Sequence, residues 1–137
     1  MIEKSNSMID ASLWNAYSRS YFRFHAEWEC SSYAVITAWN PFSKWRSNKE
    51  NYESNQRLEA RLHGRNYVAV TVGDKAFHWY EESFAAEIEP EEAIELAKAF
   101  RQHAIYYVEN GQLSLIGCVE PQIRQRIGQI KDKLLTG

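Results

Sequence analysis

The sequence is poor in the residues that build disulfides and metal sites. Its 137 residues include two cysteines, Cys30 and Cys118, which lie far apart and form no CxxC pair. No histidine stands at metal-ligand spacing from either of them, so a zinc site is not expected. Unpaired thiols are typical of chains that fold in a reducing compartment. We therefore place the protein in the cytoplasm, with free cysteines and no bound metal.

Long hydrophobic runs and known cofactor motifs are also missing. No apolar run approaches the roughly 18 residues of a membrane span, and residues 1–7 are polar rather than signal-like. No P-loop or dinucleotide-binding fingerprint is present. We expect no membrane anchor, no secretory signal and no cofactor, and we expect a flexible tail over residues 1–9.

Net positive charge is absent as well. The net charge is −2, which argues against generic nucleic-acid binding, because clustered Lys and Arg supply most of that affinity. The charges are uneven along the chain: six basic residues lie between Lys44 and Arg65, and seven glutamates lie between Glu81 and Glu95. This distribution predicts two surface patches of opposite sign.

The remaining composition is that of one ordinary globular domain. Hydrophobic residues make up 45% of the chain and aromatic residues 14%, enough to build a core and too many for a disordered chain. We therefore expect a single domain over residues 1–137.

Hydrophobic spacing and turn residues predict the elements of the first half. A helix capped by Asp10 or Ser12 continues with helical spacing to Phe24, although residues 21–28 could equally form a strand. A strand follows over residues 33–38, and Asn40-Pro41 ends it. Ser47 and Glu50 then form a capping box that begins a helix over residues 47–62.

The second half is predicted in the same way. Strands are expected at residues 67–72, 76–80 and 83–88, and Glu89-Pro90 opens a helix that ends near Gln102-His103. Asn110-Gly111 predicts a hairpin between residues 105–108 and 112–116. A last helix is expected from near Pro121, with an apolar stripe of Ile123, Ile127, Ile130 and Leu134.

This order of elements indicates the fold class. It contains the split β-α-β pattern of ferredoxin-like α+β sandwiches, in which helices cover one face of a mostly antiparallel sheet. Because that fold supports many unrelated activities, the function has to be inferred from a site.

Three asparagines form the first candidate site. Asn51, Asn55, Leu58 and Leu62 fall on one helical face, so two amides continue the face that the leucines bury, and Asn40 closes the preceding strand. A buried amide group left unpaired costs roughly 1–3 kcal/mol, so a loop backbone, a water or a ligand must satisfy it. The helix N-terminus with Arg46 or Lys44 could bind a phosphate or carboxylate. The alternative is that the asparagines only pin a loop.

A strand carboxylate forms the second candidate site. Alternation along the strand puts Glu81 and Ser83 on one face and sends Glu82 to the other. Glu81 is the catalytic candidate, as a general base whose pKa is tuned by burial or a charged neighbour. The alternative for such a glutamate is solvation or an ion pair. His103, at the expected helix end, would complement the helix dipole.

Several short motifs resemble a bacterial family of uncharacterised proteins, domain of unknown function 3293. They are Ile36-Thr-Ala-Trp-Asn-Pro41, Glu50-Asn51 with Asn55 and Leu58, Glu81-x-Ser83-Phe84, and Phe100-x-Gln102 followed by Ala104-Ile105. The resemblance extends over residues 13–115. It implies shared positions but supplies no substrate or reaction.

The residues favour a small cytoplasmic binding or regulatory module for a small polar or anionic ligand. Amides and a hydroxyl orient a polar ligand well but offer no tunable proton. One alternative is a hydrolase or transferase acting on a phosphorylated or nucleotide-like substrate, with Glu81 as base. Another is a protein-protein interaction module that uses the acidic segment 81–95. The expected pocket consists of Asn40, Arg46, Asn51, Asn55, Glu81, Ser83 and Gln102.

Overall fold

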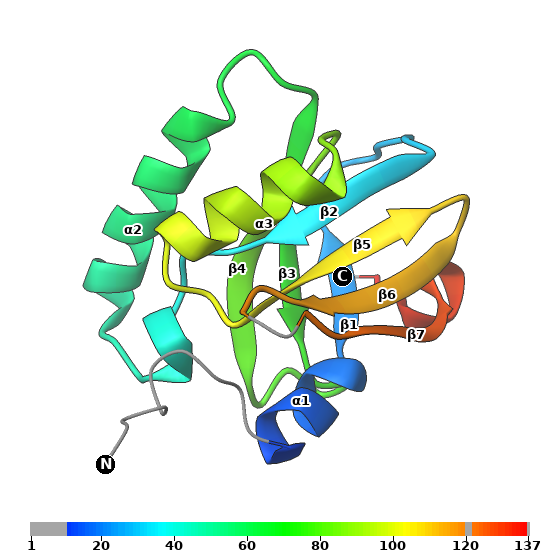
Figure 1. Cartoon of the computed structure of the whole chain (residues 1–137), viewed down its shortest axis with the longest axis horizontal. Coiled ribbons are helices and arrows are strands. Elements are labelled where there is room, and N and C mark those ends of the chain that lie inside the picture. Colours follow the sequence, from blue (N-terminus) through cyan, green and yellow to red (C-terminus); the bar gives the residue numbers. More distant parts are fainter. Residues whose placement is uncertain (1–10, 120–121, 137) are drawn as a thin grey trace.

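A curled seven-stranded antiparallel sheet organises the protein (Figure 1). The computed structural model describes residues 11–119 and 122–136. The strands lie in the order β1-β3-β4-β2-β5-β6-β7, and each neighbouring pair is antiparallel. Their bounds are β1 Tyr21–Phe24, β2 Ser32–Ile36, β3 Tyr67–Gly73, β4 Tyr80–Ala86, β5 Ala104–Glu109, β6 Gln112–Gly117 and β7 Arg124–Gln129.

Three α-helices and two short 3-10 helices complete the described chain. The α-helices are α1 Ala11–Ser18, α2 Asn48–Arg61 and α3 Pro90–Ala99, and the 3-10 helices are η1 Pro41–Ser43 and η2 Ile130–Lys133. The predicted α+β class with an antiparallel sheet is therefore confirmed. The predicted tail over residues 1–9 and the cap at Asp10 lie outside the described residues.

The sheet separates two apolar clusters. On its outer face, Leu58 of α2 and one side of α3 pack against Ile36, Phe84 and Ile105. On its inner face the sheet encloses a second cluster, which α1 joins through Trp14 and Tyr17. Helices α2 and α3 thus share one face as predicted, whereas α1 packs against the other. The inner cluster consists of Phe22, Tyr33, Val35, Val70, Val72, Ala85, Tyr106, Val108, Leu113 and Leu115.

The chain after β7 connects the two edges of the sheet. The Ile130 amide donates to the Gly111 carbonyl at 2.9 Å, and the Leu135 amide donates to the Phe22 carbonyl of β1 at 2.8 Å. Leu134 also forms a parallel bridge with Phe22. Ile130 of this segment packs against the apolar cluster on the inner face, so the segment covers part of that face.

The predicted last helix is wrong over the described residues. Residues 124–129 form strand β7 instead, because the open edge of β6 supplies hydrogen-bond partners, and a 3-10 helix follows. Gly128 has a φ of 128°, which a helix does not allow, and lies at the bulge in this pairing. The expected start at Pro121 lies outside the described residues.

Two other boundaries differ from the prediction. The first helix ends at Ser18, and the strand alternative is correct for Tyr21–Phe24, because β1 pairs with β3. The strand expected at residues 83–88 is β4, which begins earlier, at Tyr80, and ends at Ala86. The strand expected at residues 76–80 is wrong, because residues 74–79 form a turn. Asp74 holds this turn, since its carboxylate accepts the His78 amide at 2.8 Å and its carbonyl accepts the Phe77 amide at 3.0 Å.

The predicted capping box at the start of α2 is present. Ser47 Oγ accepts the Glu50 amide and Glu50 Oε1 accepts the Ser47 amide, both at 3.2 Å. We expect Ser47→Ala to lower the free energy of unfolding by about 1 kcal/mol, because an orphan helix donor loses its acceptor. Urea denaturation measures this loss. Ser47→Thr keeps the hydroxyl and should retain most of the stability; equal losses in both variants would contradict a capping role.

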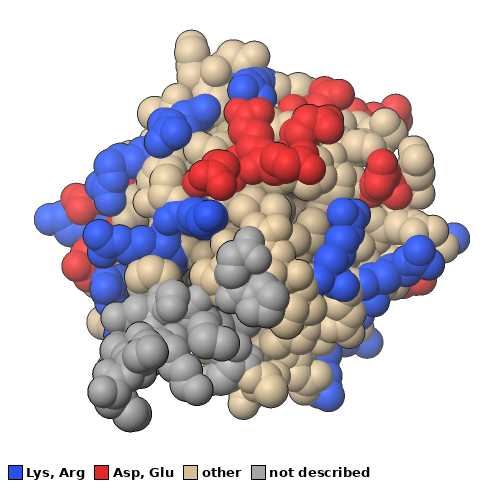
Figure 2. Space-filling view, in the orientation of Figure 1, with Lys and Arg blue, Asp and Glu red and all other residues tan. Residues whose placement is uncertain are grey.

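Charged side chains are segregated on the surface. Figure 2 shows acidic side chains gathered over α3 and basic side chains over α2. Arg65, just after α2, forms two hydrogen bonds with the Glu92 carboxylate of α3, at 3.0 and 2.5 Å. Glu81 is buried and takes no part in the acidic surface, so the acidic segment 81–95 does not act as one exposed face.

No helix among the described residues is both long enough and apolar enough to cross a membrane.

Candidate functional site

The side chains of Asn51 and Asn55 are almost fully buried beneath the loop that joins β2 to α2. Their carbonyl oxygens accept backbone amides, Asn51 from Asn40 at 2.8 Å and Asn55 from Ala38 at 2.9 Å. Their amide nitrogens donate to Asn40 Oδ1 at 2.9 Å and to the Glu82 carbonyl at 2.9 Å, respectively. Both amides are thus paired with the protein itself.

Asn40 and Arg46, the other predicted residues of this cluster, also bond to the protein itself. Asn40 has a φ of 46°, and its side-chain oxygen accepts the Arg46 backbone amide at 2.9 Å. The Arg46 guanidinium bonds the Trp45 carbonyl at an exposed position. These contacts fix the path of the loop and support the structural interpretation of Asn40, Asn51 and Asn55.

Glu81 lies elsewhere, on the inner face of the sheet. In β4, Glu81 is paired with Val72 and Ser83 with Val70, and both valines belong to the inner cluster. The exposed fraction is 7% for Glu81 and 4% for Ser83. The adjacent Glu82 points to the opposite face, where its carboxylate accepts the Thr71 hydroxyl at 2.6 Å. The predicted alternation is therefore present, with only one glutamate facing inward.

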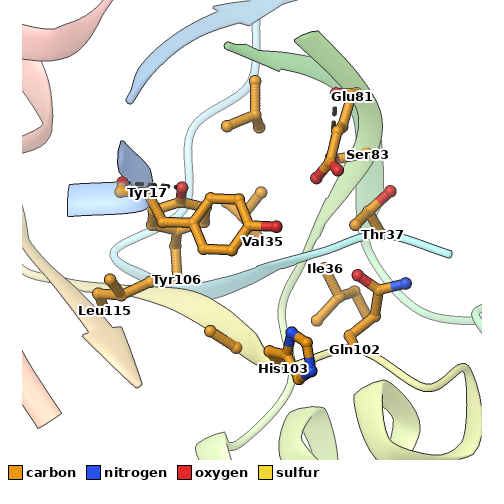
Figure 3. A pocket seen from close by; sticks show the side chains of 12 residues that line it. Tyr17, Val35, Ile36, Thr37, Glu81, Ser83, Gln102, His103, Tyr106 and Leu115 are labelled. Carbon is orange, nitrogen blue, oxygen red and sulfur yellow. Dashed lines mark hydrogen bonds between the residues drawn. The ribbon is translucent and has the colours of Figure 1, made fainter. Parts of the chain in front are cut away.

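A small cavity lies beside Glu81, between β4 and the residues that cover this end of the sheet. Figure 3 shows Glu81 and Ser83 on one side and Tyr17 and Tyr106 on the other. Its volume is about 20 Å³, and a cavity needs roughly 10–15 Å³ on this measure to hold one water molecule. The cavity therefore admits one water-sized polar group.

The Glu81 carboxyl is a buried titratable group that the described residues leave without a hydrogen bond or ion pair. Burial raises its pKa from 4.5 to about 8, because the charged form loses hydration. The carboxyl is therefore mostly protonated at pH 7 and can donate a hydrogen bond. Such a pKa places Glu81 in the range where proton transfer near neutral pH is efficient.

A polar network borders the cavity on the α1 side. The Tyr106 hydroxyl donates to the Tyr17 carbonyl at 2.9 Å and shares a hydrogen bond with Ser20 Oγ at 2.7 Å. Burial raises the pKa of both tyrosines well above the ordinary value, and the Glu81 charge raises each further. Both hydroxyls therefore stay protonated, and they lie within the electrostatic reach of Glu81.

The same network continues to His103. The Tyr17 hydroxyl shares a hydrogen bond with Ser43 Oγ at 2.8 Å, and Ser43 Oγ lies 3.0 Å from His103 Nδ1. Helix α3 ends at Ala99, so His103 is not the predicted helix-end residue. It lies instead in the chain that leads into β5, with its ring packed on Phe42 at a centroid distance of 5.5 Å.

Ser43 lies in a turn with a strained backbone. Asn40, Phe42 and Ser43 have φ values of 46°, 54° and 61°, in the left-handed region that non-glycine residues rarely adopt. The Phe42 amide donates to the Arg101 carbonyl at 2.7 Å, which ties this turn to the end of α3. Strained residues cost about 1–3 kcal/mol each and cluster at functional sites.

The remaining predicted site residue, Gln102, lines the Glu81 cavity. It is 8% exposed, and its Nε2 donates to the Trp39 and Phe100 carbonyls, both at 3.2 Å. The structure thus brings Glu81, Ser83 and Gln102 together, whereas Asn40, Arg46, Asn51 and Asn55 are not among the residues that line this cavity. Among the described residues, no group of three His, Cys, Asp or Glu side chains is arranged to hold a metal ion.

Sequence reasoning missed Tyr17, Ser43 and Tyr106. For Tyr106 a signal existed, since it alternates with the outward-facing Ile105 and Tyr107 in the predicted hairpin. Tyr17 and Ser43 carried no such signal, because their contacts depend on how α1 and the loop after β2 dock onto the sheet.

Fold and site together define an α+β protein with a partly closed polar cavity at one end of a curled antiparallel sheet. The chain belongs to the family described as Protein of unknown function (DUF3293), whose model matches residues 36–105. This match confirms the family that the motifs predicted and includes Asn40, Asn51, Asn55, Glu81, Ser83 and Gln102. No curated protein and no solved structure matches the chain.

Proposed function

We propose that the protein is a binding module whose ligand places a small polar or anionic group beside Glu81. The observation that carries this proposal is a buried carboxyl that faces a cavity and has no hydrogen-bond partner among the described residues. Buried polar groups are nearly always satisfied in native proteins, so a carboxyl without a protein partner is expected to pair with water in the cavity or with a ligand that displaces it.

The chemistry of the cavity restricts the ligand. Below pH 8 the protonated Glu81 donates a hydrogen bond to a carbonyl, carboxylate or phosphoryl oxygen. Ser83 and Gln102 add a hydroxyl and an amide to the lining. Because the cavity holds one water-sized group, only the polar end of the ligand enters it, and the remainder lies outside.

A thermal-shift screen with a matched pair of variants tests this proposal. The panel contains small carboxylates, amino acids, phosphorylated metabolites, nucleotides and primary amides. A selective ligand at 100 times its Kd stabilises the folded state by about 2.7 kcal/mol, which raises Tm by several degrees. We expect such a shift in the native protein and in Glu82→Leu, and its loss in Glu81→Leu, whose side chain cannot donate a hydrogen bond. A panel on which the native protein and Glu81→Leu respond alike would contradict the proposal.

A second candidate function is a hydrolase or transferase, favoured by the contact between Ser43 and His103. A hydroxyl 3.0 Å from an imidazole nitrogen, on a strained turn, is an arrangement that activates serine nucleophiles. For this candidate Glu81 serves as a proton donor or acceptor, acting on an ester or phosphoester. Ser43→Ala distinguishes the two functions: an enzyme loses turnover of nitrophenyl ester or phosphate probes, whereas a binding module retains its ligand and has no turnover to lose.

We also propose that the central part of the fold is related to ferredoxin-like sandwiches. The strand order β3-β4-β2-β5 supports this, because β4 lies between the two strands that α2 connects. The packing of α2 and α3 on one face supports it as well. Strands β1, β6 and β7 then extend this arrangement into the curled sheet.

A reducing, cytoplasmic location is a further part of this proposal. Both thiols are free: Cys30 is partly exposed and Cys118 is fully buried. Disulfides are rare in reducing compartments, so two unpaired thiols are consistent with such a location.

A further inference from the structure

A second and larger pocket lies at the opposite end of the inner face. Its volume is about 600 Å³, within the 300–1,000 Å³ range typical of small-molecule sites, and it opens to solvent. One wall comes from β1 and the chain that leads into β2, and the other from the segment after β7. The lining residues are Phe24, Ala26, Trp28, Glu29, Cys30, Tyr33, Ile130, Leu134, Leu135 and Thr136.

Three aromatic rings give this pocket a fixed wall. The Trp28 and Tyr33 rings meet edge to face at a centroid distance of 5.0 Å, and Phe24 packs against Tyr33 at 6.1 Å and Trp28 at 6.3 Å. Trp28 Nε1 donates to Asn66 Oδ1 at 3.0 Å, which fixes the indole. The wall is therefore formed before any ligand binds.

The described lining of this pocket carries negative charge and no positive charge. Among the described residues of the lining, Glu29 is the only charged one, and it is exposed. Glu87 acts on the Cys30 thiol, whose pKa is raised by burial and by this negative charge. Of the two lysines on η2, neither lines the pocket, and Lys133 lies over the Tyr21 ring at 5.1 Å. Among the described lining residues, an anion would meet a carboxylate and no base.

We propose that this pocket binds an apolar molecule that carries a positively charged amine. Aromatic faces attract cations through their quadrupole, and the Glu29 carboxylate complements the charge at the rim, while Ile130, Leu134 and Leu135 cover the apolar part. The proposal uses none of the residues around Glu81 and stands independently of the function proposed for that cavity.

Three probes with one ring system and different charges test the charge preference. They are 2-(1-naphthyl)ethylamine, 2-(1-naphthyl)ethanol and 1-naphthylacetate, each titrated into the full chain by calorimetry. A parallel readout is the rate at which iodoacetamide alkylates Cys30, which lines the pocket, with the fully buried Cys118 as internal reference. We expect the amine to bind most tightly and to slow Cys30 alkylation at least fivefold at saturation, and the acetate to do neither.

A matched pair of glutamates isolates the charge contribution. Glu29→Gln should weaken the amine about fivefold, the upper range for an exposed ion pair, and leave the affinity of the alcohol unchanged. Glu27→Gln, which changes an exposed glutamate two residues away that does not line the pocket, should change neither affinity. Equal affinities for the three probes, tighter binding of the acetate, or no binding at all would overturn the proposal. If alkylation of Cys30 slows as the protein concentration rises without any probe, a second copy of the chain covers the pocket, and the proposal is overturned.

Discussion

Glu81→Gln should remove most of the pH dependence of stability between pH 5 and pH 8. In the folded protein, burial holds the pKa of this carboxyl at about 8, above its ordinary value of 4.5. Between these two values the folded state binds more protons than the unfolded state, so stability falls as the pH rises. The favourable contribution is fully present below pH 4.5 and is lost as the pH passes through 8.

The size of this effect follows from the two pKa values. Each pH unit over which the folded protein retains the extra proton changes the free energy of unfolding by about 1.4 kcal/mol. Over the whole interval the loss is on the order of 5 kcal/mol, comparable with the lower end of the total stability of a small domain. A glutamine cannot titrate, so this loss is absent from the variant.

Urea denaturation of both proteins at pH 5, 6, 7 and 8 measures the difference. The native protein should become steadily less stable across the series, while Glu81→Gln should lose much less. Glu53→Gln, at an exposed position on α2, is the control and should follow the native protein. Parallel pH profiles for the native protein and Glu81→Gln would show that Glu81 is not the group responsible.

Elements with strong local signals were predictable from the sequence. The Ser47 capping box starts α2 as expected, and Asn110 and Gly111 both adopt the positive φ that the predicted hairpin turn requires. The prediction of a helix in the region of β7 was wrong. The spacing of Ile123, Ile127, Ile130 and Leu134 is helical, but the strand that pairs with this region, β6, is distant from the local pattern. Pairing with a distant edge overrode the local pattern.

The difference between local signals and long-range packing also explains which parts of the candidate site were predictable. Alternation in β4 was enough to place Glu81 and Ser83 on one face and Glu82 on the other. It could not show that Tyr17 and Ser43 approach this face, since α1 and η1 reach it only through tertiary packing. The sequence likewise indicated that Asn51 and Asn55 are buried, but their partners, the Ala38 amide and the Glu82 carbonyl, follow from the folded loop.

The double variant Asn51→Ala/Asn55→Ala should be among the most destabilising changes on the outer face of the sheet. It leaves the backbone amides of Ala38 and Asn40 without their side-chain acceptors in a largely buried environment, while the Glu82 carbonyl still accepts the Thr37 hydroxyl at 2.6 Å. At about 1–3 kcal/mol for each buried amide left unpaired, the expected loss is roughly 2–6 kcal/mol. Urea denaturation measures it, and the exposed pair Glu53→Ala/Gln56→Ala on the same helix should change stability by less than about 1 kcal/mol.

The single variant Asn55→Ala keeps this prediction testable if the double variant does not fold. Its expected loss is about 1–3 kcal/mol, because the Ala38 amide loses its acceptor while the Glu82 carbonyl keeps the Thr37 hydroxyl. Since Asn55 does not line the Glu81 cavity, a compound that requires Glu81 should still raise the Tm of this variant. A small loss of stability together with a lost thermal shift would instead assign the asparagines to the ligand. The combination of low stability and retained binding separates the residues that hold the loop from the residues that hold the ligand.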